Sequence, residues 1–84
     1  MIVSFDPKAW DEYLHWQRND KSIARKIHSL IAECQRHPFE GTGKPEPLKN
    51  DLSGYWSRRI NREHRLIYRV TDREILIIQC RYHY

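Results

Sequence analysis

The fold of this chain is decided by three strand patterns in its second half: Tyr55-Trp56-Ser57-Arg58-Arg59-Ile60, then His64-Arg65-Leu66-Ile67-Tyr68-Arg69-Val70, then Glu74 to Tyr82. Each pattern is rich in the β-branched and aromatic side chains that favour strands. The turns between them are short and polar, at residues 61–63 and 71–73. Because strands joined by such short turns pair antiparallel with their neighbours, this stretch predicts a three-stranded meander.

Alternation of side chains along these strands predicts two different faces. Pairing across the first turn places Arg59 opposite Arg65, on one face with Ser57 and Arg69. The other face, which we expect to lie towards helices, carries Trp56, Leu66, Tyr68 and Val70. If the second turn sets Gln79 beside Arg65, the arginine face also holds Gln79, Arg81 and His83. A slip of one residue would reverse this, so the register of the last strand stays open.

The first half of the chain predicts one strand and two helices. Residues 1–5 are short and apolar, and Asp6-Pro7 is a helix start with a capping carboxylate. A second helix is capped by Asp20, has a clean apolar stripe, and ends before Pro38. The predicted fold class is therefore α+β: an N-terminal strand, a two-helix hairpin, and a three-stranded antiparallel meander that forms one sheet with the first strand.

Residues 39–52 separate the helices from the meander and are predicted to be a loop. They contain two of the three glycines and two of the four prolines. A loop of this length in so small a chain is usually functional or disordered. Because Pro45 and Pro47 restrict the backbone around Glu46, we expect this carboxylate to project from a stiffened segment.

Composition limits the class of protein. The 84 residues predict a single domain, residues 1–84, with a small core. No apolar run approaches the roughly 20 residues of a membrane span, so we expect no contact with a membrane. Cys34 and Cys80 lack the spacing of metal ligands and are predicted to be reduced core thiols of a cytosolic protein, with one disulfide as the alternative.

The net charge of +4 lies in the second half of the chain. Residues 1–43 carry six basic and six acidic side chains, whereas residues 44–84 carry nine basic and five acidic ones. Seven of those nine are arginines, whose planar guanidinium suits bidentate contact with phosphate. This distribution predicts contact with nucleic acid or an acidic protein; a solvated cationic surface is the alternative.

The chain ends on Arg81-Tyr82-His83-Tyr84. An imidazole titrates near neutrality, so a held His83 gives or takes a proton readily. A histidine, arginines and the loop carboxylate together would supply what metal-free RNA cleavage needs: a base for the 2′-OH, positive charge for the phosphorane, and an acid for the 5′-oxygen. The alternative for this tail is an aromatic plug that closes a small core. The other four histidines, including His64, are interpreted as structural.

Five stretches of the chain carry a resemblance to a known family: Pro38-Phe39-Glu40-Gly41, Gly43-Lys44-Pro45-Glu46-Pro47-Leu48-Lys49, Leu52-Ser53-Gly54-Tyr55-Trp56-Ser57-Arg58-Arg59-Ile60, Glu63-His64-Arg65-Leu66, and Cys80-Arg81-Tyr82-His83-Tyr84. From end to end, the chain resembles the YoeB toxins of the RelE/ParE superfamily, the ribosome-dependent mRNA interferases of bacterial toxin–antitoxin pairs. The resemblance implies a small RelE-like fold and an endoribonuclease that needs no metal or other cofactor.

The resemblance also implies roles for six residues. Glu46 resembles the general base for the 2′-OH, His83 the general acid, and Arg65 the phosphate clamp. Tyr84 resembles a residue that orients or stacks on substrate. Lys49 and Arg59 resemble contacts to the RNA backbone or to ribosomal RNA. The alternatives are an exposed loop glutamate for Glu46, a surface ion pair with Glu63 or Glu74 for Arg65, packing for the two tail residues, and plain solvation for Lys49 and Arg59.

The family implies several partners. They are a YefM-like antitoxin whose C-terminal segment wraps the toxin, messenger RNA in the ribosomal A site, operator DNA reached only through the antitoxin complex, and a second copy of the toxin. Two other functions compete: a ParE-like toxin that poisons a topoisomerase without cutting RNA, and a basic nucleic-acid-binding domain without toxicity. The joint presence of Glu46, Arg65 and a terminal His83-Tyr84 favours the nuclease, because a pure binder has no use for that set.

Overall fold

A computed structural model describes residues 1–82, so His83 and Tyr84 lie outside the described residues. Residues 1–82 form eight elements, in the order β1 (Ile2–Phe5), α1 (Pro7–Asn19), α2 (Lys21–Arg36), β2 (Glu46–Pro47), the short 3-10 helix η1 (Asn50–Leu52), β3 (Trp56–Arg59), β4 (Arg65–Val70) and β5 (Glu74–Gln79).

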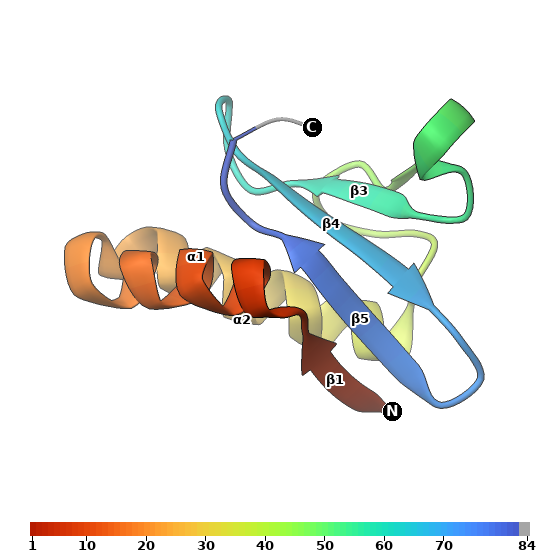
Figure 1. The fold of residues 1–84 in the computed structure, drawn as a ribbon, viewed down its shortest axis with the longest axis horizontal. Coiled ribbons are helices and arrows are strands. Elements are labelled where there is room, and N and C mark those ends of the chain that lie inside the picture. The colour runs from red at the N-terminus through yellow and green to blue at the C-terminus, as the bar shows by residue number, and fades with distance from the viewer. Residues whose placement is uncertain (83–84) are drawn as a thin grey trace.

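The five strands form one sheet in the order β1-β5-β4-β3-β2 (Figure 1). β1 runs parallel to β5, and each other neighbouring pair is antiparallel. Both helices share a core with β4 and β5, and so cover one face of the sheet. The predicted α+β fold is confirmed, including the N-terminal strand that joins the meander at β5.

Both helices start at the predicted caps. The Asp6 carboxylate accepts a hydrogen bond from the Ala9 N–H at 2.8 Å. The Asp20 carboxylate accepts from the Ser22 and Ile23 N–H groups, and hydrogen bonds, first of all from the Ser22 side chain, lower the pKa of Asp20. These bonds satisfy N–H groups that have no partner inside a helix. The capping aspartates thus fix where the hairpin begins and where it turns.

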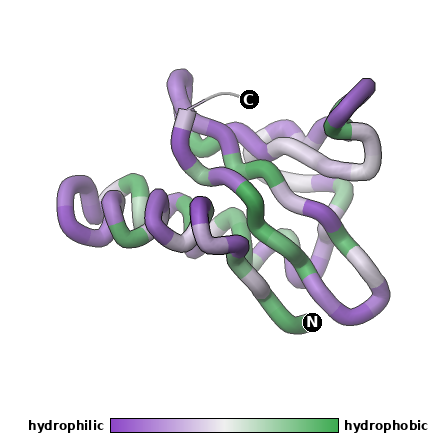
Figure 2. Tube along the Cα trace, in the orientation of Figure 1, coloured by the Kyte–Doolittle hydropathy of each residue, from purple (hydrophilic) through white to green (hydrophobic). Residues whose placement is uncertain are grey.

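The core lies between the helices and the strands β4 and β5. Hydrophobic residues gather along β1 and β5 in Figure 2. The largest fully buried hydrophobic side chains of this core come from α2, β4 and β5: Ile27, Leu30, Leu66, Tyr68, Ile75 and Ile77. Leu66 and Tyr68 therefore face the helices, as strand alternation predicted.

Arg58 of β3 is fully buried on the same side of the sheet. Its Nε donates to the Tyr68 hydroxyl at 3.1 Å. Its two Nη atoms donate to three backbone carbonyl oxygens, those of His37, Glu40 and Thr42. The Tyr68 hydroxyl in turn donates to the Pro38 carbonyl, and burial raises the pKa of Tyr68 to about 12. Arg58 therefore fastens the segment that leads into β2 onto the sheet, and it is not available to a partner.

Two boundaries differ from the sequence prediction. Residues 39–52 are not a continuous loop, because Glu46–Pro47 pairs with β3 and Asn50–Leu52 forms η1. The last strand ends at Gln79 and not at Tyr82. Beyond it, the Cys80 N–H donates to the Glu12 carboxylate of α1 and Tyr82 takes a left-handed φ of 63°. The chain therefore leaves the sheet before it reaches the tail.

Gly41→Ala should destabilise the fold more than Gly54→Ala does. Both glycines have a left-handed backbone, with φ of +108° and +95°. A Cβ at Gly41 would clash with Glu33 Oε1, which accepts the Thr42 N–H, whereas a Cβ at Gly54 meets nothing within 4 Å. We expect the free energy of unfolding, measured with urea, to fall by about 2–3 kcal/mol in Gly41→Ala and by about 1 kcal/mol in Gly54→Ala. Equal losses would mean that Glu33 moves aside without cost.

Candidate active site

Glu46 is positioned by the short strand β2. It pairs directly with Ser57 of β3 in an antiparallel register, and its side chain is exposed. Directly opposed residues point to the same side of a sheet, so Glu46 shares the face of Ser57. We call this the distal face, because it lies away from the helices; it also carries Arg59, Arg65, Ile67 and Gln79.

Arg59 and Arg65 lie directly opposite each other on the distal face. This pairing confirms the prediction made from the length of the first turn. Between them and Glu46, Ser57 and Ile67 form a floor that is 6% and 0% exposed. Glu46 and Arg65 are separated by two strand spacings of about 4.8 Å and two residues of about 3.4 Å, so their Cα atoms lie roughly 12 Å apart.

The Arg65 guanidinium is held by the turn that precedes β4. Its Nη1 donates to the Asn61 carbonyl at 2.7 Å and to the His64 carbonyl at 3.1 Å. Neither Glu63 nor Glu74 forms the ion pair that was the alternative for Arg65, and Glu74 accepts from the Ser4 hydroxyl instead. The remaining guanidinium nitrogens, Nε and Nη2, donate to no group within residues 1–82.

Lys49 lies at the start of η1 with an exposed side chain. It lines the same shallow hollow as Glu46, which residues 46–52 form. The structure thus brings Lys49 next to Glu46 in the chain turn that follows β2. Lys49 does not lie on β3 or β4, the strands that carry Arg59 and Arg65.

The tail residues His83 and Tyr84 fall outside the described residues, and Tyr82 is the last residue described. The Tyr82 carbonyl accepts the Arg65 N–H at 3.1 Å. A bulge at Ile67/Tyr68 places Gln79 opposite Ile67, on the distal face but not beside Arg65. Arg81 does not share that face, because its guanidinium carbon lies 5.7 Å from the Trp16 ring centre.

His64 was interpreted as structural, and the structure buries it, but its hydrogen bond to Tyr82 was not predicted from the sequence. It is 7% exposed, and its Nδ1 accepts the Tyr82 N–H at 2.7 Å. Strand alternation gives a signal, since His64 precedes Leu66 and Tyr68 by two and four residues and so faces the helices with them. Burial, the largest cause, and the charges of Arg81, Arg65 and His15 lower the pKa of His64, against an opposing effect of Glu63.

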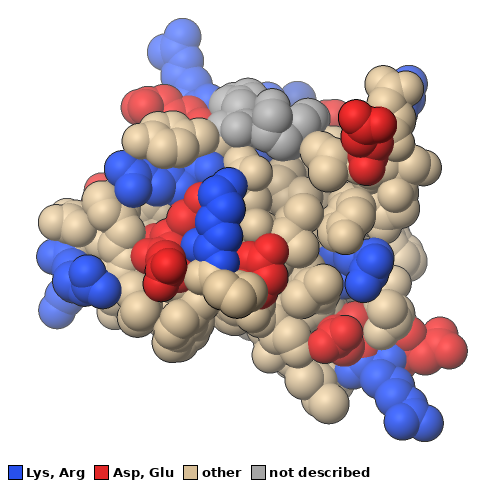
Figure 3. Space-filling view, in the orientation of Figure 1, with Lys and Arg blue, Asp and Glu red and all other residues tan. Residues whose placement is uncertain are grey.

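The basic residues of the second half are not spread over one surface. On the side seen in Figure 3, Lys and Arg are interspersed with Asp and Glu. Arg58 is buried, and Arg69 lies over the Tyr55 ring at 5.4 Å. Within residues 1–82, no helix has the length and apolar character to cross a membrane, and no group of three or more His, Cys, Asp or Glu side chains is placed to hold a metal ion.

Comparison with known proteins assigns the chain to a family. The family described as YoeB-like toxin of bacterial type II toxin–antitoxin system matches residues 5–84. Toxin YoeB of Escherichia coli K12 is 58% identical over 84 residues, the full length of both chains. The chain belongs to the YoeB-like toxins of type II toxin–antitoxin systems.

Solved YoeB structures share the fold closely. A YoeB/ParE toxin from Agrobacterium tumefaciens superposes with a TM-score of 0.98 at 50% identity, over all of both chains. A heterotetrameric YoeB–YefM toxin–antitoxin complex from Staphylococcus aureus contains a chain with a TM-score of 0.93 and 48% identity, covering 100% of this chain and 98% of that one. The resemblance seen in the sequence, and the RelE-like fold that it implied, are confirmed.

Proposed function

We propose that this YoeB-like toxin is an endoribonuclease that cleaves messenger RNA in the ribosomal A site. The register of β2, β3 and β4 carries the proposal, because it sets the carboxylate of Glu46 and the guanidinium groups of Arg59 and Arg65 on one sheet face. The backbone leading to His83 is fastened beside Arg65, through the Tyr82 carbonyl. Family membership supports the same assignment.

The proposed reaction is an intramolecular transesterification of the RNA. Glu46 removes the proton of a ribose 2′-OH, and the 2′-oxygen attacks the adjacent phosphorus. Arg65 offsets the negative charge that develops on the phosphorane. The bond from phosphorus to the 5′-oxygen then breaks, and His83 in its protonated form gives that oxygen a proton. The products are a 2′,3′-cyclic phosphate and a 5′-hydroxyl, so the reaction balances without a cofactor.

Three further residues hold the RNA in this proposal. Arg59 and Lys49, both exposed, contact phosphates of the message or of ribosomal RNA. Tyr84 stacks on or orients the nucleotide at the cut. Because phosphate contacts release counterions, binding to the ribosome should weaken as the salt concentration rises.

The partners of the relatives suggest those of this chain. A Staphylococcus aureus YoeB forms a heterotetrameric complex with YefM, and a YoeB dimer is known from the same organism. We infer that this chain binds a YefM-like antitoxin, that it dimerises, and that it acts in the cytoplasm, where its ribosomal substrate lies. The toxin–antitoxin complex would repress its own operon through operator DNA. Co-expression of the cognate antitoxin should restore growth.

His83→Gln should lower A-site cleavage by about 10²-fold or more, because glutamine cannot supply a proton to the leaving oxygen. Primer extension on a translated message measures the cuts, and circular dichroism checks the fold. His37→Gln is the matched control, since the His37 side chain is 59% exposed and lies outside the proposed site. Full cleavage by His83→Gln would remove His83 from the mechanism.

The same assay separates the nuclease from the ParE-like alternative. Discrete cuts in translated messages are expected of the wild-type chain. Intact transcripts together with gyrase-linked DNA breaks would contradict the nuclease and support a topoisomerase poison.

A further inference from the structure

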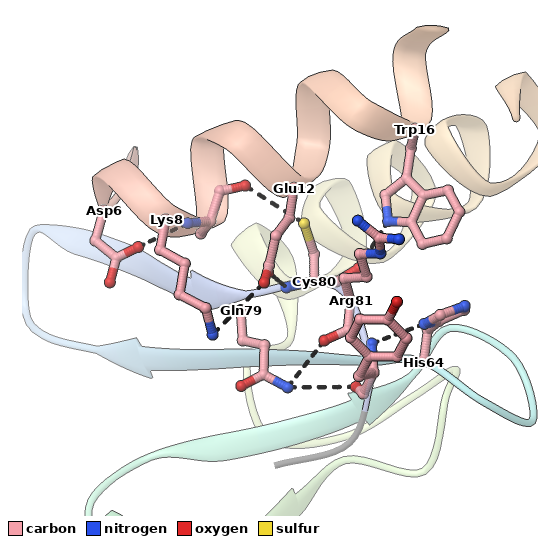
Figure 4. Close-up of polar contacts among 10 residues, drawn as sticks. Asp6, Lys8, Glu12, Trp16, His64, Gln79, Cys80 and Arg81 are labelled. Carbon is pink, nitrogen blue, oxygen red and sulfur yellow. Dashed lines mark hydrogen bonds and ion pairs between the residues drawn. The ribbon is translucent and has the colours of Figure 1, made fainter. Parts of the chain in front are cut away.

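The segment Cys80–Tyr82, which leads to the proposed catalytic tail, is held by side chains from several elements (Figure 4). Its first residue is fixed by α1: the Cys80 N–H donates to Glu12 Oε1 at 2.8 Å, and the Cys80 carbonyl accepts from Trp16 Nε1 at 2.9 Å. The Gln79 amide donates to the carbonyls of Arg81 and Tyr82, at 3.0 and 3.3 Å. Side chains of α1 and β5 thus hold the segment although it lies outside the sheet.

The last described residue, Tyr82, is held at both of its backbone polar groups. Its N–H donates to His64 Nδ1 at 2.7 Å, and its carbonyl accepts the Arg65 N–H at 3.1 Å. Two consecutive residues, His64 and Arg65, thus form hydrogen bonds with the peptide groups that precede and follow the Tyr82 Cα. Arg65 is also the proposed phosphate clamp, so the starting point of the tail is set relative to the clamp.

The His64 ring is itself fixed. It packs edge-on against Trp16, with ring centres 4.7 Å apart, and against the Tyr82 ring at 5.5 Å. Its backbone N–H donates to Asn61 Oδ1 and its carbonyl accepts the Ile60 N–H. An imidazole nitrogen accepts an N–H only when it carries no proton, so this contact requires the neutral ring with its proton on Nε2.

The charges around the ring favour that neutral form. His15 of α1, Arg65 of β4 and Arg81 of the segment Cys80–Tyr82 act on it as positive charges, whereas Glu63 of the preceding turn is the one opposing charge among these neighbours. With burial as the main cause, they lower the pKa of His64 from its ordinary 6.5. The bond to Tyr82 is therefore fully formed above about pH 6.5 and is lost as the pH falls through the lowered value.

We propose that His64 is a positioning residue of the nuclease: its unprotonated Nδ1 holds the Tyr82 N–H and thereby sets where His83 and Tyr84 start relative to Arg65. The proposal rests on the proposed function and adds to it the group that aims the general acid. Loss of this bond would free the Tyr82 N–H next to His83 without changing the chemistry of His83, and small misplacements of a reacting group cost about 10²-fold in rate.

Two variants of similar size separate the acceptor from the packing. In His64→Asn, Oδ1 stands as many bonds from the backbone as Nδ1 and accepts an N–H, but it does not titrate. In His64→Leu, a methyl group takes that place. We expect single-turnover mRNA cleavage to fall about 10–100-fold in His64→Leu and to stay within about 3-fold of wild type in His64→Asn, with both variants folded by circular dichroism.

A second measurement reads the tail itself. In wild-type protein, the NMR resonance of the Tyr82 amide should move on acidification from pH 7.5 to 5, in step with the His64 ring. In His64→Asn it should stay constant, and in His64→Leu it should lie at the position of an unbonded amide at every pH. This readout does not depend on catalysis by His83.

The outcomes are distinct. Equal cleavage by His64→Leu and wild type, or equal loss in both variants, overturns the positioning role, and so does a Tyr82 amide that ignores the protonation of His64. If the wild-type chain cuts no message, the proposed nuclease fails, and the NMR titration still decides whether His64 holds Tyr82.

Discussion

Glu46→Gln is expected to lower the rate of mRNA cleavage on translating ribosomes by about 10²–10⁴-fold while the protein stays folded. Glutamine has nearly the shape of glutamate but cannot accept the 2′-OH proton. Glu46 is exposed at the edge of the sheet, and its place in β2 is fixed by backbone pairing with Ser57, which the substitution leaves untouched. Single-turnover primer extension measures the rate, and thermal unfolding checks the fold.

Glu40→Gln is the matched control for Glu46→Gln. Its side chain is 79% exposed and lies 3.7 Å from the His37 ring nitrogen Nδ1, so the same change of charge occurs in the segment before β2. A comparable loss in both variants would trace the effect to net charge and ribosome binding. Full cleavage by Glu46→Gln would show that Glu46 is not the general base.

The parts of this geometry that depend on local rules could be predicted from the sequence. The turn at residues 61–63 is short, so it fixes the pairing of Arg59 with Arg65 within one residue. Asp6 and Asp20 identify the two helix starts because a carboxylate satisfies the first N–H groups. Side-chain alternation then assigns the strand residues to two faces. Each of these inferences needs only neighbours in the chain.

The features that could not be predicted depend on contacts between distant residues. The end of β5 is set by Glu12, which takes the Cys80 N–H from 68 positions away. The bulge at Ile67/Tyr68 shifts the last strand, and no residue in the sequence marks it. Arg58 is another case, since its three carbonyl partners lie 16 to 21 residues earlier. A basic residue has to be assumed exposed until its partners are known.

His64 is a different case, because strand alternation alone indicates its buried position. Alternation puts it on the helix side with Leu66, where a polar ring needs a hydrogen-bond partner. That partner is the N–H of Tyr82, in the segment Cys80–Tyr82 that follows β5. A histidine assigned to a buried face next to a candidate site residue therefore indicates a positioning contact, even when no paired residue is visible in the sequence.

Arg58→Met should lower the free energy of unfolding by about 3–5 kcal/mol, a large share of the stability of so small a domain. Methionine fills much of the space of the arginine stem but leaves the carbonyls of residues 37, 40 and 42 and the Tyr68 hydroxyl without their donor. Arg58→Lys should recover only part of the loss, because one ammonium cannot reach the same fork of acceptors. Urea unfolding followed by tryptophan fluorescence measures all three proteins.

The neighbouring residue gives the sharpest control. Arg59→Met changes the same side chain one position along β3, on the opposite face, where it is exposed. We expect a change in unfolding free energy within about 0.5 kcal/mol, together with weaker cleavage from the lost phosphate contact. The two substitutions should therefore separate stability from activity within one strand. If Arg58→Met were as stable as Arg59→Met, its hydrogen bonds would not hold the segment before β2, and the rigid placement of Glu46 would need another cause.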